Sequence, residues 1–371
     1  MMRLHLAHNE KIIERCINNF EEVFPGENKW IILNTTGKDY VQNHRNVVKC
    51  NPDSKCFWEN LGKISQYDKI IIHYLSSDIA RFICKISHPS IYWIEWGGDL
   101  YNGLLSRRGF QLYYDKDIEW KILGHRMPKF LFNMYWGINS WKSNKLFMRA
   151  IKKIRYFVPD SMYDEYPLLM NYYPELNHLQ YRGFFYYPID EVLGENYNSR
   201  YSKDKNIIVG NSASLTGNHS EVFQLLSNLD LFNRKVIVPL SYGPKLYVDY
   251  VVERGEKLLQ DRFEPIVNYM SLQDYNTLLE SANIFIYNNY RQEAVGNILV
   301  ALYLGGKVFL NKRNPLLKFY KSIGLHLFEI DDLYAPDAFA SLSSDSIEEN
   351  RSLLMKTYSR ERLLTLIRTN M

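Results

Sequence analysis

Short apolar runs alternate with amphipathic stretches along most of this chain, and this alternation restricts its fold more than any other feature. In the first half, runs typical of strands are separated by stretches with helical spacing of apolar residues, such as residues 10–23 and 78–86. Strands that alternate with helices favour a parallel sheet, because a helix fills each crossover connection. The runs that predict strands here are residues 4–7, 29–33, 46–49, 69–75, 90–96 and 154–158.

The same pattern starts afresh in the second half, after a polar stretch at residues 197–205 that we interpret as a linker. Strands are predicted at residues 206–209, 235–239, 283–287 and 307–311, and helices at residues 220–229, 246–259, 272–280 and 297–304. Ser271 is the expected N-cap of the third helix. A length of 371 residues also suits two domains. We therefore expect an α/β protein with two Rossmann-like, doubly wound domains, residues 1–196 and 197–345, and a helical tail, residues 346–371, that can pack back on the N-terminal domain.

Charge is unevenly distributed along the chain. The 45 Lys and Arg residues and 41 Asp and Glu residues give a formal net charge of +4. Residues 104–156 alone hold twelve Lys and Arg residues against three Asp and Glu residues, a net charge of +9, so the remainder sums to −5. A basic stretch of this kind indicates an anionic partner.

The amino-terminal residues lack the apolar core of a signal peptide, because His8, Asn9, Glu10 and Lys11 interrupt them. No apolar run is long enough to predict a membrane-spanning helix. The four cysteines have spacings that match neither a zinc site nor a redox pair. We expect reduced thiols in a cytoplasmic protein.

Several standard fingerprints are absent from the sequence. There is no G-x-G-x-x-G after the first strand, which disfavours a dinucleotide oxidoreductase, and no Walker loop, H-E-x-x-H or G-x-S-x-G. Asp115 and Asp117 form a D-x-D triplet, a pattern that can hold a divalent metal with a nucleotide diphosphate. The triplet follows no predicted strand and lies among lysines, so we interpret it as the start of a solvated helix.

Two loops that leave a strand and enter a helix are candidates for binding phosphate. In residues 209–219 small side chains allow close approach of a ligand, and a helix N-terminus attracts anions. In residues 290–297, Arg291 can pair with a diphosphate through charge-assisted hydrogen bonds. Two such loops at one sheet edge fit a nucleotide diphosphate better than either alone. Tyr242 ends a neighbouring strand and can stack on a base or a sugar. Structural turns with helix caps are the alternative for all three segments.

Residues 93–101, W-I-E-W-G-G-D-L-Y, join a strand end, two glycines, a carboxylate and aromatic residues. At the carboxyl edge of a strand, Asp99 could act as general base towards an acceptor hydroxyl, and Trp96 or Tyr101 could stack on a sugar. Alternatively, Asp99 caps the following helix. His73, at the end of the preceding strand, is a second candidate base, with a structural role as its alternative.

At these motifs the chain resembles the bacterial N-acetylfucosaminyltransferases that act on lipid II of enterobacterial common antigen, glycosyltransferase family 56. The motifs follow one another in the expected order over most of the chain. They are W-x-x-W-G-x-D-L-Y at residues 93–101, I-x-V-G-N-S at 207–212 with Asn218 and His219, V-P-x-x-Y at 238–242, R-Q-x-x-x-G at 291–296, L-N-x-x-N-P at 310–315, and the strand-end His73.

The resemblance implies a GT-B-like architecture, with two Rossmann-like domains that face a cleft and a nucleotide-sugar donor on the C-terminal domain. Carried over by motif, the donor-site candidates are Gly210, Asn211, Ser212, Asn218, His219, Tyr242, Gly243, Arg291, Gln292, Glu293, Gly296 and Asn297. The acceptor-site candidates are Trp93, Trp96, Gly97 and Tyr101, and the candidate catalytic groups are Asp99, His73 and Glu95. Arg291, loop amides and helix N-termini can stabilise a leaving diphosphate, so we expect no metal or other cofactor.

We therefore expect an enzyme that transfers a deoxyamino sugar, such as N-acetylfucosamine, from dTDP or UDP to a polyprenyl-diphosphate-linked saccharide in the synthesis of a bacterial surface polysaccharide, common antigen or O-antigen. A nucleotide-sugar epimerase of the same two-domain fold is one alternative. A basic nucleic-acid-binding protein built on residues 104–156 is another.

The basic segment also contains many aromatic residues, chiefly within a predicted helical stretch at residues 101–153. Cations interleaved with aromatic residues suit a membrane interface. We expect this segment to hold a peripheral enzyme at the anionic cytoplasmic face of the bacterial inner membrane, with no nucleic-acid partner. An ordinary solvated helical face is the alternative.

Overall fold

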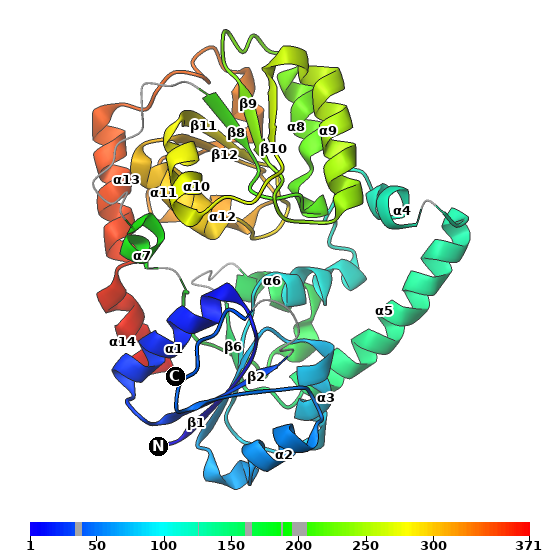
Figure 1. Ribbon diagram of the computed structural model, residues 1–371, viewed down its shortest axis with the longest axis vertical. Coiled ribbons are helices and arrows are strands. Elements are labelled where there is room, and N and C mark those ends of the chain that lie inside the picture. The colour runs from blue at the N-terminus through cyan, green and yellow to red at the C-terminus, as the bar shows by residue number, and fades with distance from the viewer. Residues whose placement is uncertain (34–38, 125, 160–164, 187, 195–205) are drawn as a thin grey trace. The chain divides into compact units, whose positions relative to one another are not determined.

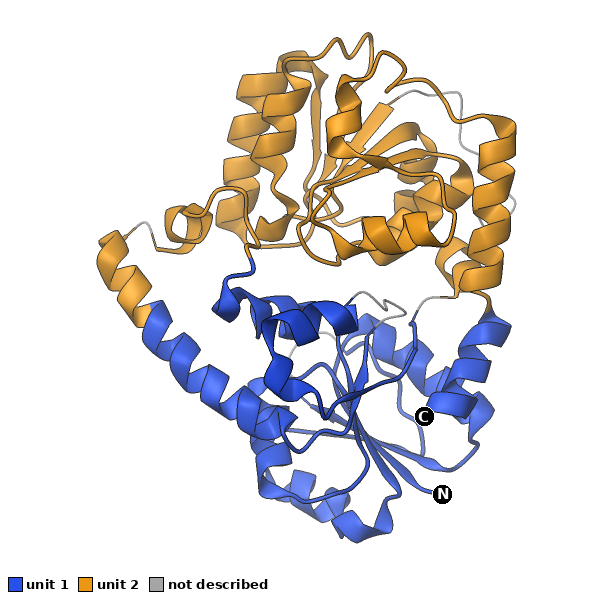
Figure 2. Ribbon diagram, turned by 180° about the vertical axis from the view of Figure 1, so that it is seen from behind, with its two compact units in different colours: residues 1–110, 136–186, 360–371 blue, residues 111–135, 187–359 orange. Residues whose placement is uncertain are grey.

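The computed structural model describes the whole chain except residues 34–38, 125, 160–164, 187 and 195–205, and it divides into two compact units (Figures 1 and 2). Unit 1 comprises residues 1–110, 136–186 and 360–371, and unit 2 comprises residues 111–135 and 187–359. The predicted linker, residues 197–205, and the predicted boundary after residue 196 lie outside the described residues.

Unit 1 is built on a parallel sheet of seven strands in the order β3-β2-β1-β4-β5-β6-β7. The strands are β1 (Arg3–His8), β2 (Asn28–Leu33), β3 (Val47–Cys50), β4 (Lys69–His73), β5 (Ile91–Ile94), β6 (Tyr156–Val158) and β7 (Gln180–Tyr181). The helices are α1 (Lys11–Val23), α2 (Lys55–Leu61), α3 (Ser77–Lys85), α6 (Glu165–Tyr172), α14 (Arg360–Asn370) and most of α5 (Lys129–Ile151).

Unit 2 is built on a parallel sheet of six strands in the order β10-β9-β8-β11-β12-β13. The strands are β8 (Asn206–Val209), β9 (Val236–Pro239), β10 (Phe263–Ile266), β11 (Ala282–Tyr287), β12 (Lys307–Leu310) and β13 (Phe328–Glu329). The helices are α4 (Ile118–Leu123), α7 (Ile189–Leu193), α8 (His219–Leu226), α9 (Lys245–Leu259), α10 (Leu272–Glu280), α11 (Val295–Leu304), α12 (Pro315–Ser322) and α13 (Ser344–Thr357).

The prediction of two doubly wound, parallel α/β sheets is confirmed. In each sheet the first strand of the unit is the third from one edge, and the chain winds outwards on one side and then on the other. This reversal creates a switch point between β1 and β4 in unit 1, and between β8 and β11 in unit 2. Ligands of open α/β sheets bind at the carboxyl ends of the strands that flank such a point. The loops after these four strands are therefore the places to look for a site.

The sequence pattern missed some elements and merged others. No strand was predicted for β10, which contains Glu264 and Pro265, because proline is expected only in edge strands such as this one. The tail predicted as continuously helical at residues 346–367 is two helices, α13 and α14. The carbonyl of Tyr358 accepts a hydrogen bond from Ile189 N instead of continuing the helix.

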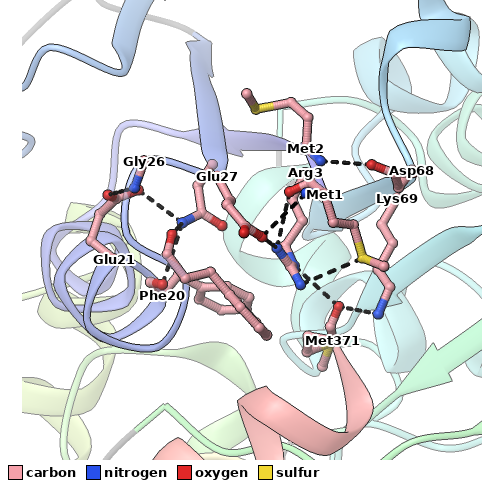
Figure 3. Close-up of polar contacts among 12 residues, drawn as sticks. Met1, Met2, Arg3, Phe20, Glu21, Gly26, Glu27, Asp68, Lys69 and Met371 are labelled. Atoms are coloured by element: carbon pink, nitrogen blue, oxygen red, sulfur yellow. Dashed lines mark hydrogen bonds and ion pairs between the residues drawn. The ribbon is translucent and has the colours of Figure 1, made fainter.

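Helix α14 returns to unit 1, where it lies against α1 (Figure 1). The carbonyl oxygen of Met371 accepts hydrogen bonds from Arg3 Nε at 3.3 Å and from the Lys69 ammonium (Figure 3). Arg3 is buried and also pairs with Glu27 at 2.8 Å. Because a buried guanidinium is costly without partners, these contacts fix the last helix of the chain on the first strand.

Candidate functional site

The candidate loops of unit 2 flank its switch point, since residues 210–218 follow β8 and residues 288–294 follow β11. Gly210 occupies the first position after β8 and donates its N–H to Ile286 O of β11 at 2.9 Å. Its φ of +70° lies in the left-handed region, which favours glycine. The chain therefore turns sharply as it leaves the strand, and the start of the loop is fixed against β11.

His219, the first residue of α8, is fully buried behind the loop that follows β8. A Cβ atom at Gly210 would lie 2.7 Å from His219 Nε2, and one at Gly217 would lie 2.5 Å from its Cε1, so both glycines make room for the ring. Nδ1 lies 3.1 Å from the Tyr247 hydroxyl. Burial lowers the pKa of His219 to about 4, so the imidazole is neutral at pH 7. Within the described part of the chain, Nε2 has no hydrogen-bond partner.

Asn218 braces the base of this loop. Its backbone is left-handed, with φ of +49°, and its side chain is buried. Oδ1 accepts from Tyr114 N at 2.9 Å, and Nδ2 donates to Thr216 O at 3.2 Å and to Asn288 O at 3.0 Å. The side chain thus joins the loop after β8 to the loop after β11 and to residues of the basic segment.

Arg291 and Glu293 form an ion pair in the loop after β11, with 3.1 Å between Nη2 and Oε2 and each side chain 14% exposed. The same carboxylate oxygen accepts hydrogen bonds from the Thr216 hydroxyl and from Asn289 Nδ2. Glu293 therefore ties the arginine to both loops at the switch point. Among the described residues Arg291 Nε is a buried donor without a partner.

The loop after β9 packs on the loop after β8. Ala213 N donates to Tyr242 O at 2.6 Å, and a Cβ atom at Gly243, whose φ is +128°, would lie 2.1 Å from Ala213 O. The ring of Tyr242 is 48% exposed and lies edge-on to that of Tyr269, with 6.0 Å between centroids. Tyr242 is therefore accessible to a ligand beside the loop of Gly210.

The other donor-site candidates differ in exposure. Asn211, Ser212 and Asn297 are partly exposed, whereas Gln292 is buried. Gly296 lies in α11 facing α7, where a Cβ atom would lie 3.6 Å from Val192 Cγ1. A side chain at this position would make only an ordinary van der Waals contact, so the packing of the two helices does not require glycine.

In unit 1, Asp99 lies in the turn of residues 98–102 that follows β5, and it is only 2% exposed. Oδ2 accepts hydrogen bonds from Leu75 N at 2.7 Å and Trp93 Nε1 at 2.6 Å, and Oδ1 accepts one from Trp96 N at 2.9 Å. Burial raises the pKa of Asp99, and these N–H donors oppose the rise. The carboxylate joins the loops after β4 and β5.

Glu95 is also fully buried, and its Oε2 accepts the Gly97 N–H at 2.6 Å. Burial and the neighbouring carboxylates of Glu165 and Asp99 raise the pKa of Glu95 well above its ordinary value, which favours its protonated form. The hydroxyl of the fully buried Tyr101 donates to Glu165 Oε1 at 2.9 Å. The two glutamates form a buried carboxyl pair beneath the tryptophan motif.

His73 belongs to a chain of buried hydrogen bonds. Its Nδ1 lies 2.8 Å from the Tyr186 hydroxyl, which accepts the Trp96 indole N–H at 2.7 Å, and its Nε2 lies 3.1 Å from His5 Nδ1. His5 Nε2 then lies 3.3 Å from Asn28 Oδ1. Because an indole only donates and an amide oxygen only accepts, every proton in the chain is oriented in one direction. Burial lowers the pKa of His73 to about 3, so the ring is neutral.

The aromatic acceptor-site candidates are not equally accessible. Trp93 and Tyr101 are fully buried, and Trp96 is partly exposed beside Tyr74, with 5.8 Å between ring centroids. Gly97 is buried and has a φ of +79°, as the tight turn requires. Trp96 is thus the member of the motif through which a sugar could be contacted.

Sequence reasoning missed several residues that complete these networks. Thr216 and Asn289 lie within or beside the candidate loops, where a cluster of hydroxyl and amide side chains was the available signal. Glu165 and Tyr186 reach the tryptophan motif from 64 and 90 residues away, and no local pattern could have paired them.

Among the described residues there is no group of three or more His, Cys, Asp or Glu side chains that could hold a metal ion. The carboxylates of the D-x-D triplet are paired with lysines, Asp115 with Lys121 at 2.5 Å and Asp117 with Lys129 at 2.6 Å. No helix in the described part of the chain has both the length and the apolar character needed to cross a membrane.

Several solved structures share the fold of the whole chain at low sequence identity. Sucrose-phosphate synthase from Thermosynechococcus elongatus superimposes with a TM-score of 0.62 at 9% identity, over 98% of this chain and 97% of that one. The HepE protein of Anabaena, in complex with UDP-glucose, gives 0.60 at 9% identity, over 99% and 98%. A glycosyltransferase from Rickettsia africae gives 0.55 at 13% identity, over 98% and 96%. The two parallel-sheet units therefore have the GT-B fold.

A family model described as 4-alpha-L-fucosyltransferase glycosyl transferase group 56 matches residues 168–356, which is more than half of the chain. The match includes the loops after β8, β9 and β11, and the tryptophan motif of unit 1 lies outside it. The fold of both units and the matched sequence agree, and the chain belongs to glycosyl transferase group 56, the 4-alpha-L-fucosyltransferase family, and is a glycosyltransferase.

Proposed function

We propose that this glycosyltransferase moves a deoxyamino sugar such as N-acetylfucosamine from a nucleoside diphosphate, dTDP or UDP, to a polyprenyl-diphosphate-linked saccharide in surface-polysaccharide synthesis. The donor binds to unit 2, at the carboxyl ends of β8, β9 and β11. UDP-glucose bound to HepE, which shares the fold, supports a nucleotide-sugar donor. The resemblance of the motifs to the N-acetylfucosaminyltransferases supports the choice of sugar and of acceptor.

One observation gives the main support for a donor site here. It is the ion pair of Arg291 with Glu293, which joins the loops on both sides of the switch point. The pair holds the guanidinium at 14% exposure while its Nε lacks a partner among the described residues. His219 Nε2 is a second buried atom without a partner in the described chain, beside the loop of Gly210. Of the two side chains, the partly exposed Arg291 guanidinium suits the oxygens of a diphosphate.

The chemical role of this site is to stabilise the negative charge that develops on the departing diphosphate. Arg291 supplies a positive charge whose orientation Glu293 fixes before the donor arrives, and a preorganised donor needs no rearrangement during the reaction. The backbone amides of Asn211 and Ser212, next to the tight turn at Gly210, donate further hydrogen bonds. Tyr242 covers the base or the sugar.

The acceptor binds to unit 1 at the carboxyl edge of β4 and β5, where Trp96 offers an aromatic face to a saccharide. Asp99 holds Trp93, Trp96 and the loop after β4 in place through its three hydrogen bonds. We assign it a positioning role, with the buried chain through His73 supporting Trp96 from behind.

The test is transfer by the full-length protein with dTDP-, UDP- and GDP-linked deoxyamino sugars and a polyprenyl-diphosphate-linked saccharide. The expected result is release of nucleoside diphosphate only when the acceptor is present, and a lipid product longer by one sugar. Conversion of the sugar nucleotide into an epimer without any acceptor would reject the proposal. Thermal stabilisation by one nucleotide over the others identifies the base, because only a bound ligand stabilises the fold.

A further inference from the structure

Helix α5 carries an exposed apolar stripe along its first three turns. The side chains of Phe130, Met134, Ile138 and Trp141 are 69%, 56%, 50% and 61% exposed. Their spacing of four, four and three residues puts them on one side of the helix. Monomeric soluble proteins rarely expose a continuous apolar surface of this kind, so the stripe indicates a partner.

The carboxyl-terminal part of α5 holds the helix on unit 1. Phe147, Ala150 and Ile151 are buried, and Ser143 Oγ accepts a hydrogen bond from Arg107 Nη2 at 3.1 Å. The Arg107 guanidinium also lies 5.4 Å from the centre of the Phe147 ring. Ser143, Phe147 and Ala150 fall on the other side of the helix from Phe130 and Met134. The apolar stripe therefore faces away from the helix's own packing surface.

The amino-terminal end of α5 packs against Gly124, the residue after α4. The ring of Phe132, which is 7% exposed, lies so close to Gly124 that a Cβ atom there would be 2.3 Å from the ring. Leu123 and Met127, beside this contact, are 49% and 42% exposed. Leu123 and Met127 extend the exposed apolar surface beyond α5.

Cations continue the stripe towards the carboxyl end of α5. Lys145 and Arg149 follow Trp141 on the same side of the helix, and the Lys145 ammonium lies 4.5 Å from the centre of the Trp141 ring. Lys142, Lys145 and Arg149 form no salt bridge within the described part of the chain. Residues 120–155 contain nine Lys and Arg residues and no Asp or Glu. The surface beside the stripe is thus purely basic.

We propose that this face of α5 docks on an anionic phospholipid bilayer, with Phe130, Met134, Ile138 and Trp141 among the acyl chains and Lys142, Lys145 and Arg149 at the headgroups. The helix does not meet the requirements for spanning a membrane, so it lies in the interface. Nucleic acid would neutralise the cations but would leave Met134 and Ile138 in water. The inference deepens the proposed function. It rests on that function in one respect, because a polyprenyl-linked acceptor resides in a bilayer.

The test is flotation of the full-length protein with phosphatidylcholine vesicles that contain or lack phosphatidylglycerol, at low and high salt. We expect binding to the anionic vesicles that weakens with salt, because cations near the surface attract anionic lipid within the screening length. Ile138→Asp should weaken binding by about tenfold or more, and the double variant Lys145→Glu, Arg149→Glu by a similar factor.

Matched controls change exposed residues elsewhere. Tyr334→Asp replaces an aromatic residue that is 63% exposed, and Lys257→Glu reverses an exposed charge of α9. Both should bind vesicles like the unchanged protein. Failure of the unchanged protein to bind anionic vesicles would overturn the inference. Equal binding by the Ile138→Asp variant would overturn it too, as would tighter binding to duplex DNA than to vesicles.

A second measurement locates the helix in the lipid. Brominated acyl chains quench tryptophans that enter the bilayer, so quenching should fall in Trp141→Phe although six other tryptophans remain. Unchanged quenching would contradict insertion at this residue. Nucleotide-induced thermal stabilisation distinguishes the two proposals: if the unchanged protein shows it but does not bind anionic vesicles, the docking inference fails and the donor site stands.

Discussion

Replacement of Asp99 by Asn tests whether this residue holds the tryptophan motif together. The carboxylate accepts three N–H groups, two on Oδ2, from Leu75 and Trp93, and one on Oδ1, from Trp96. An amide keeps only one acceptor oxygen. If that oxygen takes the place of Oδ2, the Trp96 N–H faces an NH₂ group. With the opposite orientation, two donors are lost.

The size of the effect follows from this geometry. Asp99 is 2% exposed, so water cannot replace the missing acceptor. A buried donor without a partner costs about 1–3 kcal/mol, and at least one such donor faces another donor in the variant. We therefore expect Asp99→Asn to lower the free energy of unfolding by about 2–3 kcal/mol.

Urea unfolding followed by circular dichroism measures this loss, and the expected shift in midpoint is roughly 1 M for a slope of about 2 kcal/mol per M. Asp190→Asn, at an exposed carboxylate of α7, is the control and should change stability by less than about 0.5 kcal/mol. A similarly small change for Asp99→Asn would refute the reasoning. If that variant were as stable as the unchanged protein yet inactive, Asp99 would be a base and not a positioning residue.

Three further predictions concern unit 2. Arg291→Ala should lower transfer by about 100- to 1000-fold and abolish nucleotide-induced thermal stabilisation; unchanged turnover would remove Arg291 from the site. The folded pKa of His219, about 4, is below the ordinary 6.5, so its contribution to stability is complete above pH 6.5 and is lost as pH falls towards 4. The stability difference between the unchanged protein and His219→Gln should shrink by roughly 1.4 kcal/mol per pH unit in that window, and a constant difference in urea unfolding would contradict it. Gly210→Ala should destabilise the protein more than Gly26→Ala. Both glycines have a φ near +70°, but only at Gly210 would the new Cβ atom lie 2.7 Å from His219 Nε2. Equal unfolding midpoints would show that the imidazole ring moves aside without cost.

The fold was largely predictable because strand and helix periodicity are local. The helix of residues 272–280 and its N-cap Ser271, whose side chain accepts Asp274 N, agree with the structure. Edge strand β10 was not predictable, since Pro265 is tolerated only where a neighbouring strand is missing on one side. The division of the tail at Tyr358 depends on a hydrogen bond from Ile189, far away in the sequence.

The sequence predicted which loops form the candidate site better than it predicted the roles of the individual side chains. The carboxyl ends of parallel strands lie at one edge of the sheet, whatever the side chains around them do. Gly210 and Arg291 could therefore be named as site residues from their positions after predicted strands. The roles of side chains depend on distant partners: Asn218 braces two loops through Asn288, and Glu95 lies against Glu165. General-base roles for Asp99, Glu95 and His73 stay predictions, and the burial of all three favours positioning over proton transfer at a surface.

The most direct test of the donor site is calorimetric titration of the full-length protein and of Arg291→Ala with dTDP and UDP. The account predicts that one of these nucleotides binds to the unchanged protein, that the arginine variant loses most of the affinity, and that Asp99→Asn retains it, because Asp99 belongs to unit 1. Equal affinity of the unchanged protein and the Arg291→Ala variant for the nucleotide would contradict the account.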